Sequence, residues 1–231
     1  MASATGSAER PSIAILGGTG SEGSGLALRW ADAGYRVILG SRNAEKAAQV
    51  CAGINERLAT ARVSHAANRA AAAASDVVVL CVPYAAQHGT VEEVRDALEG
   101  KILIDTTVPL MPPKVARVQL PEGGSAVAAI QDLLGGSVRV VSAFQNVAAH
   151  LLQDLDHAVE CDVLVCGDDV GARETVIKLA ADIGVRGIHA GSIANSAAAE
   201  ALTSVLIAIN SRYKIAGGAG IRITRLDGAE H

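Results

Sequence analysis

The chain has 231 residues, of which 50% are hydrophobic and 19% are charged, so it is large enough to bury a sizeable core. Its formal net charge of -4 argues against general attraction to nucleic acid. The first ten residues lack the apolar core of a signal peptide, and no apolar run reaches the roughly 18 residues of a membrane helix. We therefore expect no membrane partner, and we predict a disordered leader over residues 1–10.

The four cysteines, Cys51, Cys81, Cys161 and Cys166, form no C-x-x-C pair. Cys81 and Cys166 lie in apolar runs, where we expect small buried hydrophobic residues. This usage favours a cytoplasmic protein with free thiols. No cluster of Cys and His indicates a metal site.

The first structured stretch combines an apolar strand over 12–16, a glycine-rich turn and a helix over 21–33. The turn has the pattern G-x-G-x-x-G, formed by Gly18, Thr19, Gly20, Ser21, Glu22 and Gly23. In this setting the first glycine allows the turn, the second lets the backbone approach a pyrophosphate, and the third lets the helix pack on the strand. The helix N-terminus offers free N–H groups to phosphates. The context indicates dinucleotide binding, and the alternative is a turn that only packs a helix on a sheet.

The end of the second predicted strand, over 35–39, indicates which dinucleotide is preferred. Ser41 and Arg42 follow it, with Lys46 one turn further on. In NAD-binding versions an acidic residue about 20 positions after the glycines binds the ribose 2′-hydroxyl, and no acid stands here. A hydroxyl and a guanidinium suit a 2′-phosphate, which a carboxylate would repel. We therefore predict NADP rather than NAD, with a solvated loop arginine as the alternative for Arg42.

The next segments alternate between helix and strand, with helices predicted over 43–58 and 68–74 and strands over 61–65 and 76–82. The last strand is a continuous apolar run, as in a buried parallel strand. In such sheets ligands collect beyond the carboxyl ends of the strands. Val82, Pro83, Tyr84 and Gln87 are therefore candidates to line the nicotinamide half of the site, and an ordinary strand-end turn is the alternative.

The rest of the chain continues the alternation, with helices predicted over 90–98, 125–134, 169–183 and 196–214, and strands over 101–104, 139–143, 160–166 and 185–189. Two βαβαβ halves are complete by residue 143. The predicted fold class is therefore α/β, a Rossmann-type, doubly wound, mainly parallel sheet with a C-terminal strand–helix extension from about residue 155. Residues 11–231 are predicted to form one dinucleotide-binding domain. We expect the last helix to be well buried, because it is partly apolar all round.

Several catalytic patterns are absent from the sequence. It contains no Y-x-x-x-K pair, no P-loop and no H-E-x-x-H, and its six histidines are scattered singly. An enzyme that reduces a carbonyl must protonate a developing alkoxide, so it normally shows an acid. We therefore assign no catalytic residue and expect a hydride transfer in which the protein supplies position and electrostatics.

Five segments resemble the F420-dependent NADP reductases (F420H2:NADP oxidoreductases). They are ILGGTGSEGSGLALRWADAGYRVILGSRNAEKA, VSAFQNVA, CDVLVCGDD, GSIANSAAAEALTSVLIAIN and RYKIAGGAGIRITRL. They occur in order over nearly the whole chain, which makes the resemblance far more specific than the glycine motif alone.

The resemblance implies a small, usually dimeric enzyme that moves hydride directly between NADP(H) and the deazaflavin coenzyme F420. It implies that Thr19, Ser41 and Arg42 bind NADP. It also implies a deazaflavin site lined by loop 144–147, which contains Gln145 and Asn146 and follows Ala143, and by the region of Asn195, Ser196 and Thr203. Some archaeal members carry a histidine–threonine pair where this chain has Gln145 and Asn146, which leaves the detailed deazaflavin contacts open.

Two other functions remain open from the residues alone. One is an NADPH-dependent reductase of a small imine or carbonyl substrate, which would need an acid such as Tyr84, His150 or Asp105. The other is a non-catalytic NADP-binding sensor. The basic residues near the C-terminus suit either the anionic F420 or a solvated end or dimer contact; they are Arg212, Lys214, Arg222 and Arg225.

Overall fold

The structure is a computed structural model that describes residues 10–226. The first half contains β1 (Ile13–Leu16), α1 (Ser21–Asp32), β2 (Val37–Gly40), α2 (Ala44–Arg57), β3 (Val63–Ala66), α3 (Asn68–Ala73), β4 (Val77–Leu80), α4 (Tyr84–Val94), η1 (Arg95–Ala97) and β5 (Ile102–Asp105). The second half contains α5 (Ala126–Leu134), η2 (Gly135–Ser137), β6 (Arg139–Ser142), α6 (Ala149–Leu152), β7 (Asp162–Val165), α7 (Val170–Ala181), β8 (Arg186–His189), η3 (Ile193–Asn195) and α8 (Ser196–Tyr213).

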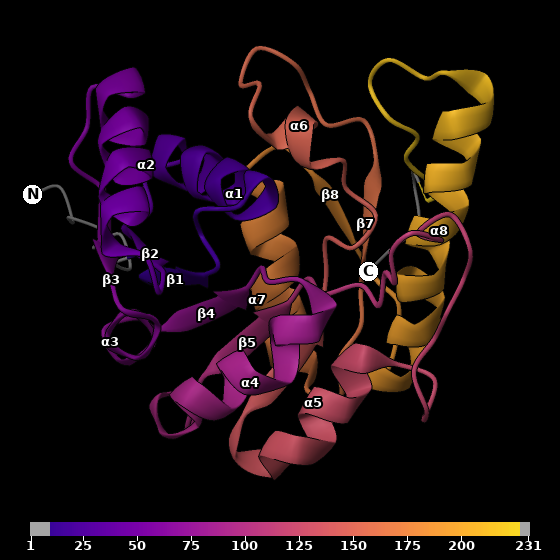
Figure 1. Ribbon diagram of the computed structural model, residues 1–231, viewed down its shortest axis with the longest axis horizontal. Helices are drawn as coiled ribbons and strands as arrows, with labels where there is room; N and C mark the ends of the chain where they lie inside the picture. Colours follow the sequence, from indigo (N-terminus) through magenta and orange to yellow (C-terminus); the bar gives the residue numbers. More distant parts are fainter. Residues whose placement is uncertain (1–9, 227–231) are drawn as a thin grey trace, which may run out of the picture.

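Six parallel strands form the main sheet in the order β3-β2-β1-β4-β5-β6 (Figure 1). Strand β1 pairs with both β2 and β4, so the chain reverses its direction of winding beside β1. This is the strand order of dinucleotide-binding Rossmann folds, and the predicted fold class is confirmed. Residues 1–9 of the predicted leader lie outside the described residues. Arg10, the last residue of that leader, places its guanidinium 5.0 Å from the centre of the Tyr35 ring.

The predicted strands and most helices agree with the structure to within a few residues, but α4 and α6 differ. Helix α4 begins at Tyr84, with Pro83 as its N-cap residue, rather than at Thr90. Proline has no N–H to lose and a fixed φ, so a helix can begin directly after it. The four-residue helix α6 was not predicted, because so short a segment carries no periodic pattern.

Helices cover both faces of the sheet and create two cores. On one face, α1, α2 and α7 contribute Leu26, Cys51 and Val176 to the larger core. On the other face, α3, α4 and α5 contribute Ala71, Val91 and Val127 to the second core. The continuous apolar strands are therefore buried on both sides, as in other doubly wound sheets.

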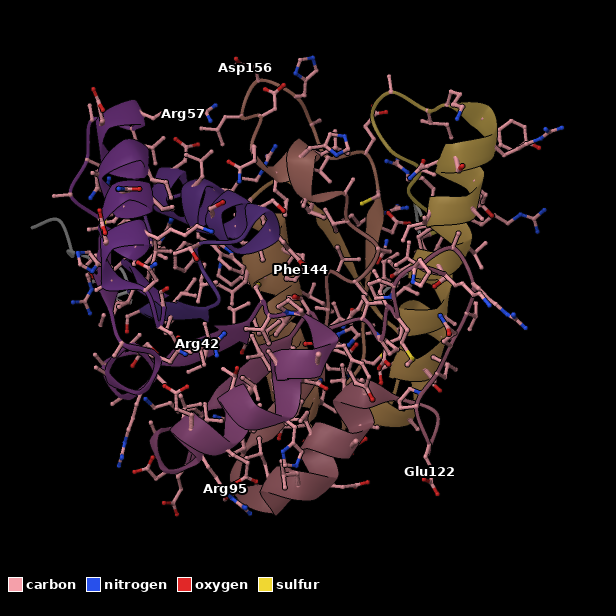
Figure 2. All side chains as sticks on the ribbon, in the orientation of Figure 1. Arg42, Arg57, Arg95, Glu122, Phe144 and Asp156 are labelled. Carbon is pink, nitrogen blue, oxygen red and sulfur yellow. The ribbon has the colours of Figure 1, made fainter. Side chains whose placement is uncertain are left out.

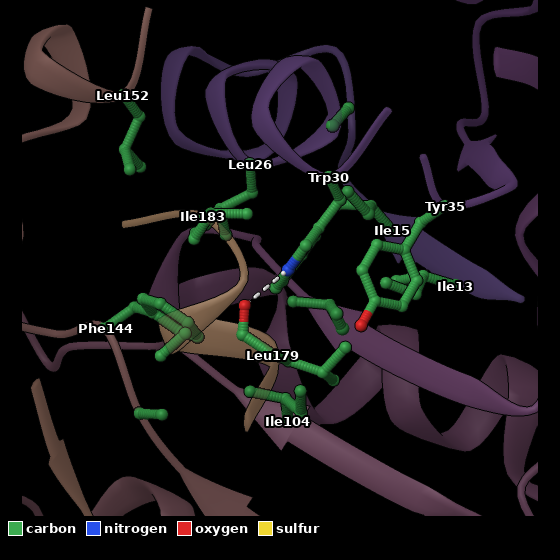
Figure 3. Packing of buried hydrophobic residues seen from close by; sticks show 14 of the residues in the cluster. Ile13, Ile15, Leu26, Trp30, Tyr35, Ile104, Phe144, Leu152, Leu179 and Ile183 are labelled. Carbon is green, nitrogen blue, oxygen red and sulfur yellow. Dashed lines mark hydrogen bonds between the residues drawn. The ribbon is translucent and has the colours of Figure 1, made fainter. Parts of the chain in front are cut away.

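Trp30 connects the first helix to the C-terminal part of the chain (Figure 3). The Trp30 side chain is fully buried. Its indole N–H donates to the Leu179 carbonyl on α7 at 3.0 Å, and its ring meets the Phe144 ring edge-on at 5.9 Å between centroids. Such an aromatic pair adds about 0.5–1.5 kcal/mol beyond its buried area. The extension and the strands before it therefore share one core.

The C-terminal extension has a small sheet of its own, in which β7 pairs with β8 in parallel. An antiparallel bridge between Ser142 and Cys166 joins it to the end of β6. Helix α8 packs beside α5, where the buried Glu200 carboxylate accepts from Ser125 Oγ at 2.6 Å and Ala126 N at 2.8 Å. This carboxylate caps the N-terminus of α5, where a negative charge is favourable.

The last helix is less buried than the sequence predicts. The segment Ile193–Tyr213 is long and apolar enough to cross a membrane by length and composition, with a mean hydropathy of 1.3, and 33% of it is buried. A single helix of this kind is weak evidence for a membrane span, because the core helices of soluble proteins have the same composition. The prediction that α8 is well buried is wrong, since the side chains of Val205 and Tyr213 are 43% and 72% exposed.

Candidate functional site

A cleft of about 420 Å³ runs along the carboxyl ends of β1, β2 and β4. It brings together residues from four segments that lie apart in the sequence and follow β1, β2, β3 and β4. They are Gly17, Thr19, Gly20, Ser41, Arg42, Asn43, Lys46, Asn68, Cys81, Val82, Pro83, Ala86 and Thr90. The position agrees with the rule that ligands bind outside the carboxyl ends of the strands where the winding reverses.

The glycine turn forms the floor of this cleft, and two of its glycines are required by close contacts. A Cβ on Gly18 would lie 2.8 Å from Leu39 Cδ2, and one on Gly23 would lie 2.9 Å from the Gly17 carbonyl oxygen. The left-handed φ of the turn, +80°, belongs to Gly17, so the turn conformation depends on Gly17 rather than on Gly18. Gly23 holds α1 against the turn, as predicted.

The β2 end of the cleft carries positive charge. Arg42 and Lys46 line it with exposed side chains, and Arg42 lies near the start of α2 (Figure 2). Asn43 caps the N-terminus of α2, because its Oδ1 accepts from Lys46 N at 2.9 Å. Ser41 Oγ accepts from Asn43 N at 3.1 Å, which fixes the hydroxyl at the mouth of the cleft. A guanidinium, an ammonium and a hydroxyl that face one space can hold a phosphate group.

Gln87 and Tyr84 do not line the cleft, in contrast to Val82 and Pro83. Gln87 is buried on α4, and its Nε2 donates to Asp105 Oδ2 at 2.7 Å and to the Ala126 carbonyl at 3.3 Å. The amide nitrogen of Gln87 therefore makes its hydrogen bonds within the protein interior. Helix α4 begins at Tyr84 and turns Gln87 toward β5, so a contact of either residue with the nicotinamide stays a prediction.

Asp105 is the centre of a buried hydrogen-bond network at the end of β5. Its Oδ1 accepts from Thr107 N at 2.9 Å, and its carbonyl accepts from Gln145 Nε2 at 2.8 Å. Burial raises the pKa of this carboxyl, while the hydrogen bonds from the Thr107 backbone N–H and from Gln87 lower it. Asp105 thus connects β5, α4 and the loop after β6, and it is not exposed for proton transfer to a substrate.

The loop after β6 is held in an unusual conformation. Phe144 is fully buried and has a left-handed φ of 73°, which is uncommon for a bulky residue and typical of functional sites. Figure 2 places Phe144 near the middle of the molecule. Ala143 is buried beside it, and Thr203 Oγ1 of α8 donates to the Gln145 carbonyl at 2.7 Å. Asn146 Nδ2 donates to the Asp162 carbonyl at 2.7 Å.

Two residues that the resemblance places at the deazaflavin site have other partners. Ser196 is buried, with its Oγ 2.6 Å from Ser125 Oγ. Asn195 donates from Nδ2 to the Ala190 carbonyl at 2.7 Å. The side chain of Thr203, by contrast, is hydrogen-bonded to loop 144–147.

Six buried side-chain oxygen atoms in the described part of the chain have no hydrogen-bond partner, and all six follow or end a strand of the main sheet at its carboxyl edge. They are Glu22 Oε1, Asn68 Oδ1, Thr107 Oγ1, Ser142 Oγ, Gln145 Oε1 and Asn146 Oδ1. An unpaired buried polar atom is costly, so each such atom in a native structure calls for an explanation. Their common edge indicates a row of contacts for a bound ligand.

The first turn of α1 contains one of these atoms, on Glu22. Burial raises the pKa of the Glu22 carboxyl to about 8; the Thr106 hydroxyl lowers this pKa, and the Asp105 carboxyl raises it further. Burial likewise raises the pKa of the Cys81 thiol well above its ordinary range. Glu22 and Cys81 therefore add no negative charge to this side of the cleft near neutral pH.

Sequence reasoning missed Asn68, Thr107 and Ser142, although each of them ends or follows a predicted strand.

Sequence reasoning also missed the role of Arg29, which donates to the carbonyls of Leu152 at 3.1 Å and Leu151 at 2.8 Å and so fixes the loop around α6. Burial lowers the pKa of this guanidinium. A second cleft of about 350 Å³ lies beyond that loop, between Asn146, Cys161 and residues 217–220.

The glycine turn lies at the base of a dinucleotide cleft, Arg42 and Lys46 make one end of this cleft basic, and the polar loop 144–147 lies at the same edge of the sheet. Together the fold and the site define an NADP-binding Rossmann oxidoreductase. The family model described as "NADP oxidoreductase coenzyme F420-dependent" matches residues 12–109. The F420-dependent NADP reductase of Methanocaldococcus jannaschii is 44% identical over 93% of this chain and 99% of its own length. That of Methanothermobacter thermautotrophicus is 42% identical over 93% of this chain and 95% of its own.

The chain belongs to the F420-dependent NADP reductase family, as its resemblance predicts. Among solved structures, a putative F420-dependent NADP reductase from Arthrobacter sp. FB24 superposes with a TM-score of 0.79 at 26% identity, covering 94% of this chain and all of that one. An imine reductase variant from Myxococcus stipitatus superposes with a TM-score of 0.60 at 20% identity, covering 89% of this chain and 62% of that one. The second likeness concerns the fold alone.

Proposed function

We propose that the chain transfers hydride between NADP(H) and coenzyme F420 in the space between the glycine turn and loop 144–147. The chain is an F420-dependent NADP reductase, an oxidoreductase whose two cofactors are its substrates. The observation that carries the proposal is the row of unpartnered oxygen atoms, which continues from Asn68 past Glu22 to Gln145 and Asn146. A bound dinucleotide would account for the atoms near the glycine turn. The atoms on Gln145 and Asn146 would then contact the ring system of a second cofactor.

The residues at the glycine turn fit NADP(H). A Cβ added to Gly20 would meet only the Gly17 carbonyl oxygen, at 3.5 Å, so the space beside this backbone is open to a pyrophosphate. The N–H groups of Ser21 and Glu22 lie at the N-terminus of α1, which favours anions. Arg42, Lys46 and Ser41 would bind the 2′-phosphate, and Val82 and Pro83 would line the path toward the nicotinamide.

The loop after β6 would bind the deazaflavin. Gln145 and Asn146 each use their amide nitrogen within the protein and keep an unpaired acceptor oxygen. Such acceptors suit the N–H groups of a polar heteroaromatic ring. The buried Ala143 and Phe144 below them give the site an apolar floor that excludes water. When both cofactors are bound they supply the hydride chemistry, and the protein residues position them.

The alternative of an imine or carbonyl reductase is not favoured. Both carboxyl oxygens of the buried Asp105 accept hydrogen bonds, from Gln87 and from the Thr107 N–H, so this carboxyl is not open to a substrate. His150 is exposed on α6. Tyr84 does not line the dinucleotide cleft. The similarity to imine reductases, near 20% identity, extends to the fold only.

We also propose a cytoplasmic homodimer. Helix α8 carries apolar side chains that are exposed in the single chain, among them Val205 and Tyr213. Burial of such a face against a second copy would remove apolar surface from water. Sedimentation velocity on the purified protein tests the dimer, and a mass of one chain at micromolar concentration would exclude it.

The function is tested by mixing the purified protein with NADPH and oxidised F420 and following the visible absorbance of the deazaflavin. We expect loss of absorbance with NADPH and far less with NADH. The variant Asn146→Ala should weaken F420 binding while NADPH binding stays unchanged. If NADPH binds tightly and the deazaflavin absorbance does not change, the proposed reaction is wrong.

A further inference from the structure

Glu22 is an unusual residue at a dinucleotide-binding turn, because it places an acidic side chain beside a site for an anionic cofactor. It is the second residue of α1. As a residue it is partly buried, and its Oε1 is fully buried without a hydrogen-bond partner. Its surroundings are Thr106, Asp105 and Cys81, which lie at the ends of β4 and β5. The carboxyl group thus faces away from the basic β2 end of the cleft.

This position places Glu22 on the nicotinamide side of the turn. In the strand order β3-β2-β1-β4-β5-β6, the two halves of a dinucleotide lie on opposite sides of β1. Arg42 follows β2 and marks the 2′-phosphate half, so the ends of β4 and β5 belong to the nicotinamide half. The unpartnered Oε1 of Glu22 therefore lies buried on the side of the nicotinamide half, although Glu22 is not among the residues that line the cleft.

The groups around Glu22 do not supply a compensating cation. From β5, Asp105 contributes a carboxyl whose own pKa is raised, and from β4, Cys81 contributes a thiol whose pKa is raised well above its ordinary value. Gln153, the C-cap residue of α6, adds an uncharged amide at the start of α1, since its Nε2 donates to the Ser21 carbonyl at 2.8 Å. The N-terminal end of α1 itself favours a negative charge, but burial has the larger effect and raises the pKa to about 8.

We propose that Glu22 sets the relative affinity of the site for NADP⁺ and NADPH by gaining or losing one proton. The oxidised nicotinamide ring carries a positive charge, and the reduced ring carries none. An ionised Glu22 carboxylate attracts the oxidised ring only, whereas a protonated Glu22 distinguishes the two rings little. Repulsion between this carboxylate and the cofactor phosphates affects both forms alike and cancels in the ratio of their affinities. This inference rests on the proposed NADP(H) site and does not involve F420.

The test is the ratio of the dissociation constants for NADPH and NADP⁺, measured by fluorescence and calorimetric titration without F420. Between about pH 6 and about pH 9.5 we expect this ratio to rise at least about tenfold in favour of NADP⁺, the effect of one nearby unit charge at a partly buried site. In Glu22→Gln, which keeps the shape and lacks the titration, the ratio should not change with pH. Glu56→Gln, which removes an exposed charge on α2, is the matched control and should behave as the native chain.

Two results would overturn the inference: a ratio that stays constant with pH in the native chain, or a pH-dependent ratio that persists in Glu22→Gln. If the variant does not fold, the native profile still decides. A further readout is proton exchange, measured by calorimetry at about pH 8 in two buffers. NADP⁺ binding should release more protons than NADPH binding in the native chain but not in the variant. Failure of both dinucleotides to bind would instead contradict the proposed cofactor site.

Discussion

Gln87 donates a 2.7 Å hydrogen bond to the carboxyl oxygen Oδ2 of Asp105, and both side chains are buried. The sequence suggests that Gln87 faces the nicotinamide, whereas in the structure this hydrogen bond joins α4 to the end of β5. Asp105 in turn accepts from Thr107 and holds Gln145 through its carbonyl. The pair therefore links α4 to the loop proposed to bind the deazaflavin.

Replacing Gln87 with Met should lower the free energy of unfolding by about 1–3 kcal/mol, because it leaves a buried carboxyl oxygen without its donor. Urea denaturation followed by circular dichroism measures this change. Gln49→Met, at an exposed position of α2, serves as the control and should stay close to the native value. Equal stability of both variants would show that the Gln87–Asp105 bond contributes nothing.

Arg42→Ala should weaken NADPH binding while NADH binding stays nearly unchanged. The lost charged hydrogen bond is worth roughly 1.5–3 kcal/mol, or about one to two decades of affinity. Fluorescence titration with both dinucleotides gives the comparison. Arg36→Ala, an exposed arginine just before β2 at the opposite edge of the sheet, is the matched control. If NADPH and NADH weaken equally, Arg42 does not contact the 2′-phosphate.

Gly23→Ala should abolish tight NADPH binding, because the new Cβ would lie 2.9 Å from both the Gly17 carbonyl oxygen and Gly18 Cα and would push α1 off the turn. Gly53→Ala is the control, since a Cβ at this helical position meets no atom within 4 Å. That change should raise stability by about 0.5–1 kcal/mol. Calorimetric titration and thermal unfolding measure the two effects. Native-like binding by Gly23→Ala would contradict the close approach.

The raised pKa of Glu22 should make the stability of the cofactor-free protein depend on pH. The folded chain holds this proton up to about pH 8, while the unfolded chain releases it near the ordinary pKa of about 4.3. Between these two values the folded state binds more protons, so the Glu22 contribution to the free energy of unfolding falls as pH rises. Glu22→Gln should therefore gain stability relative to the native chain between about pH 5 and about pH 8.5. Urea denaturation across this range checks the difference, and a constant difference would mean that Glu22 titrates normally.

The sequence by itself determined the fold class and one end of the site. Alternating apolar runs and helical patterns are local signals, and the glycine turn lies within one strand–turn–helix segment. The same holds for Ser41, Arg42 and Lys46, which follow the second strand directly. Asn43 was also predictable as a cap, because capping depends on residues three positions apart.

Only the tertiary structure decided which side chains face the cofactor space at the other end. Gln87 and Ser196 form buried hydrogen bonds with residues 18 and 71 positions away, and no local pattern reports such partners. The left-handed Phe144, the two-stranded sheet of β7 and β8, and the exposed face of α8 likewise depend on packing between distant segments. The row of unpaired oxygen atoms could not be predicted from the sequence either. A polar atom is left without a hydrogen-bond partner only when distant segments of the fold exclude water from it.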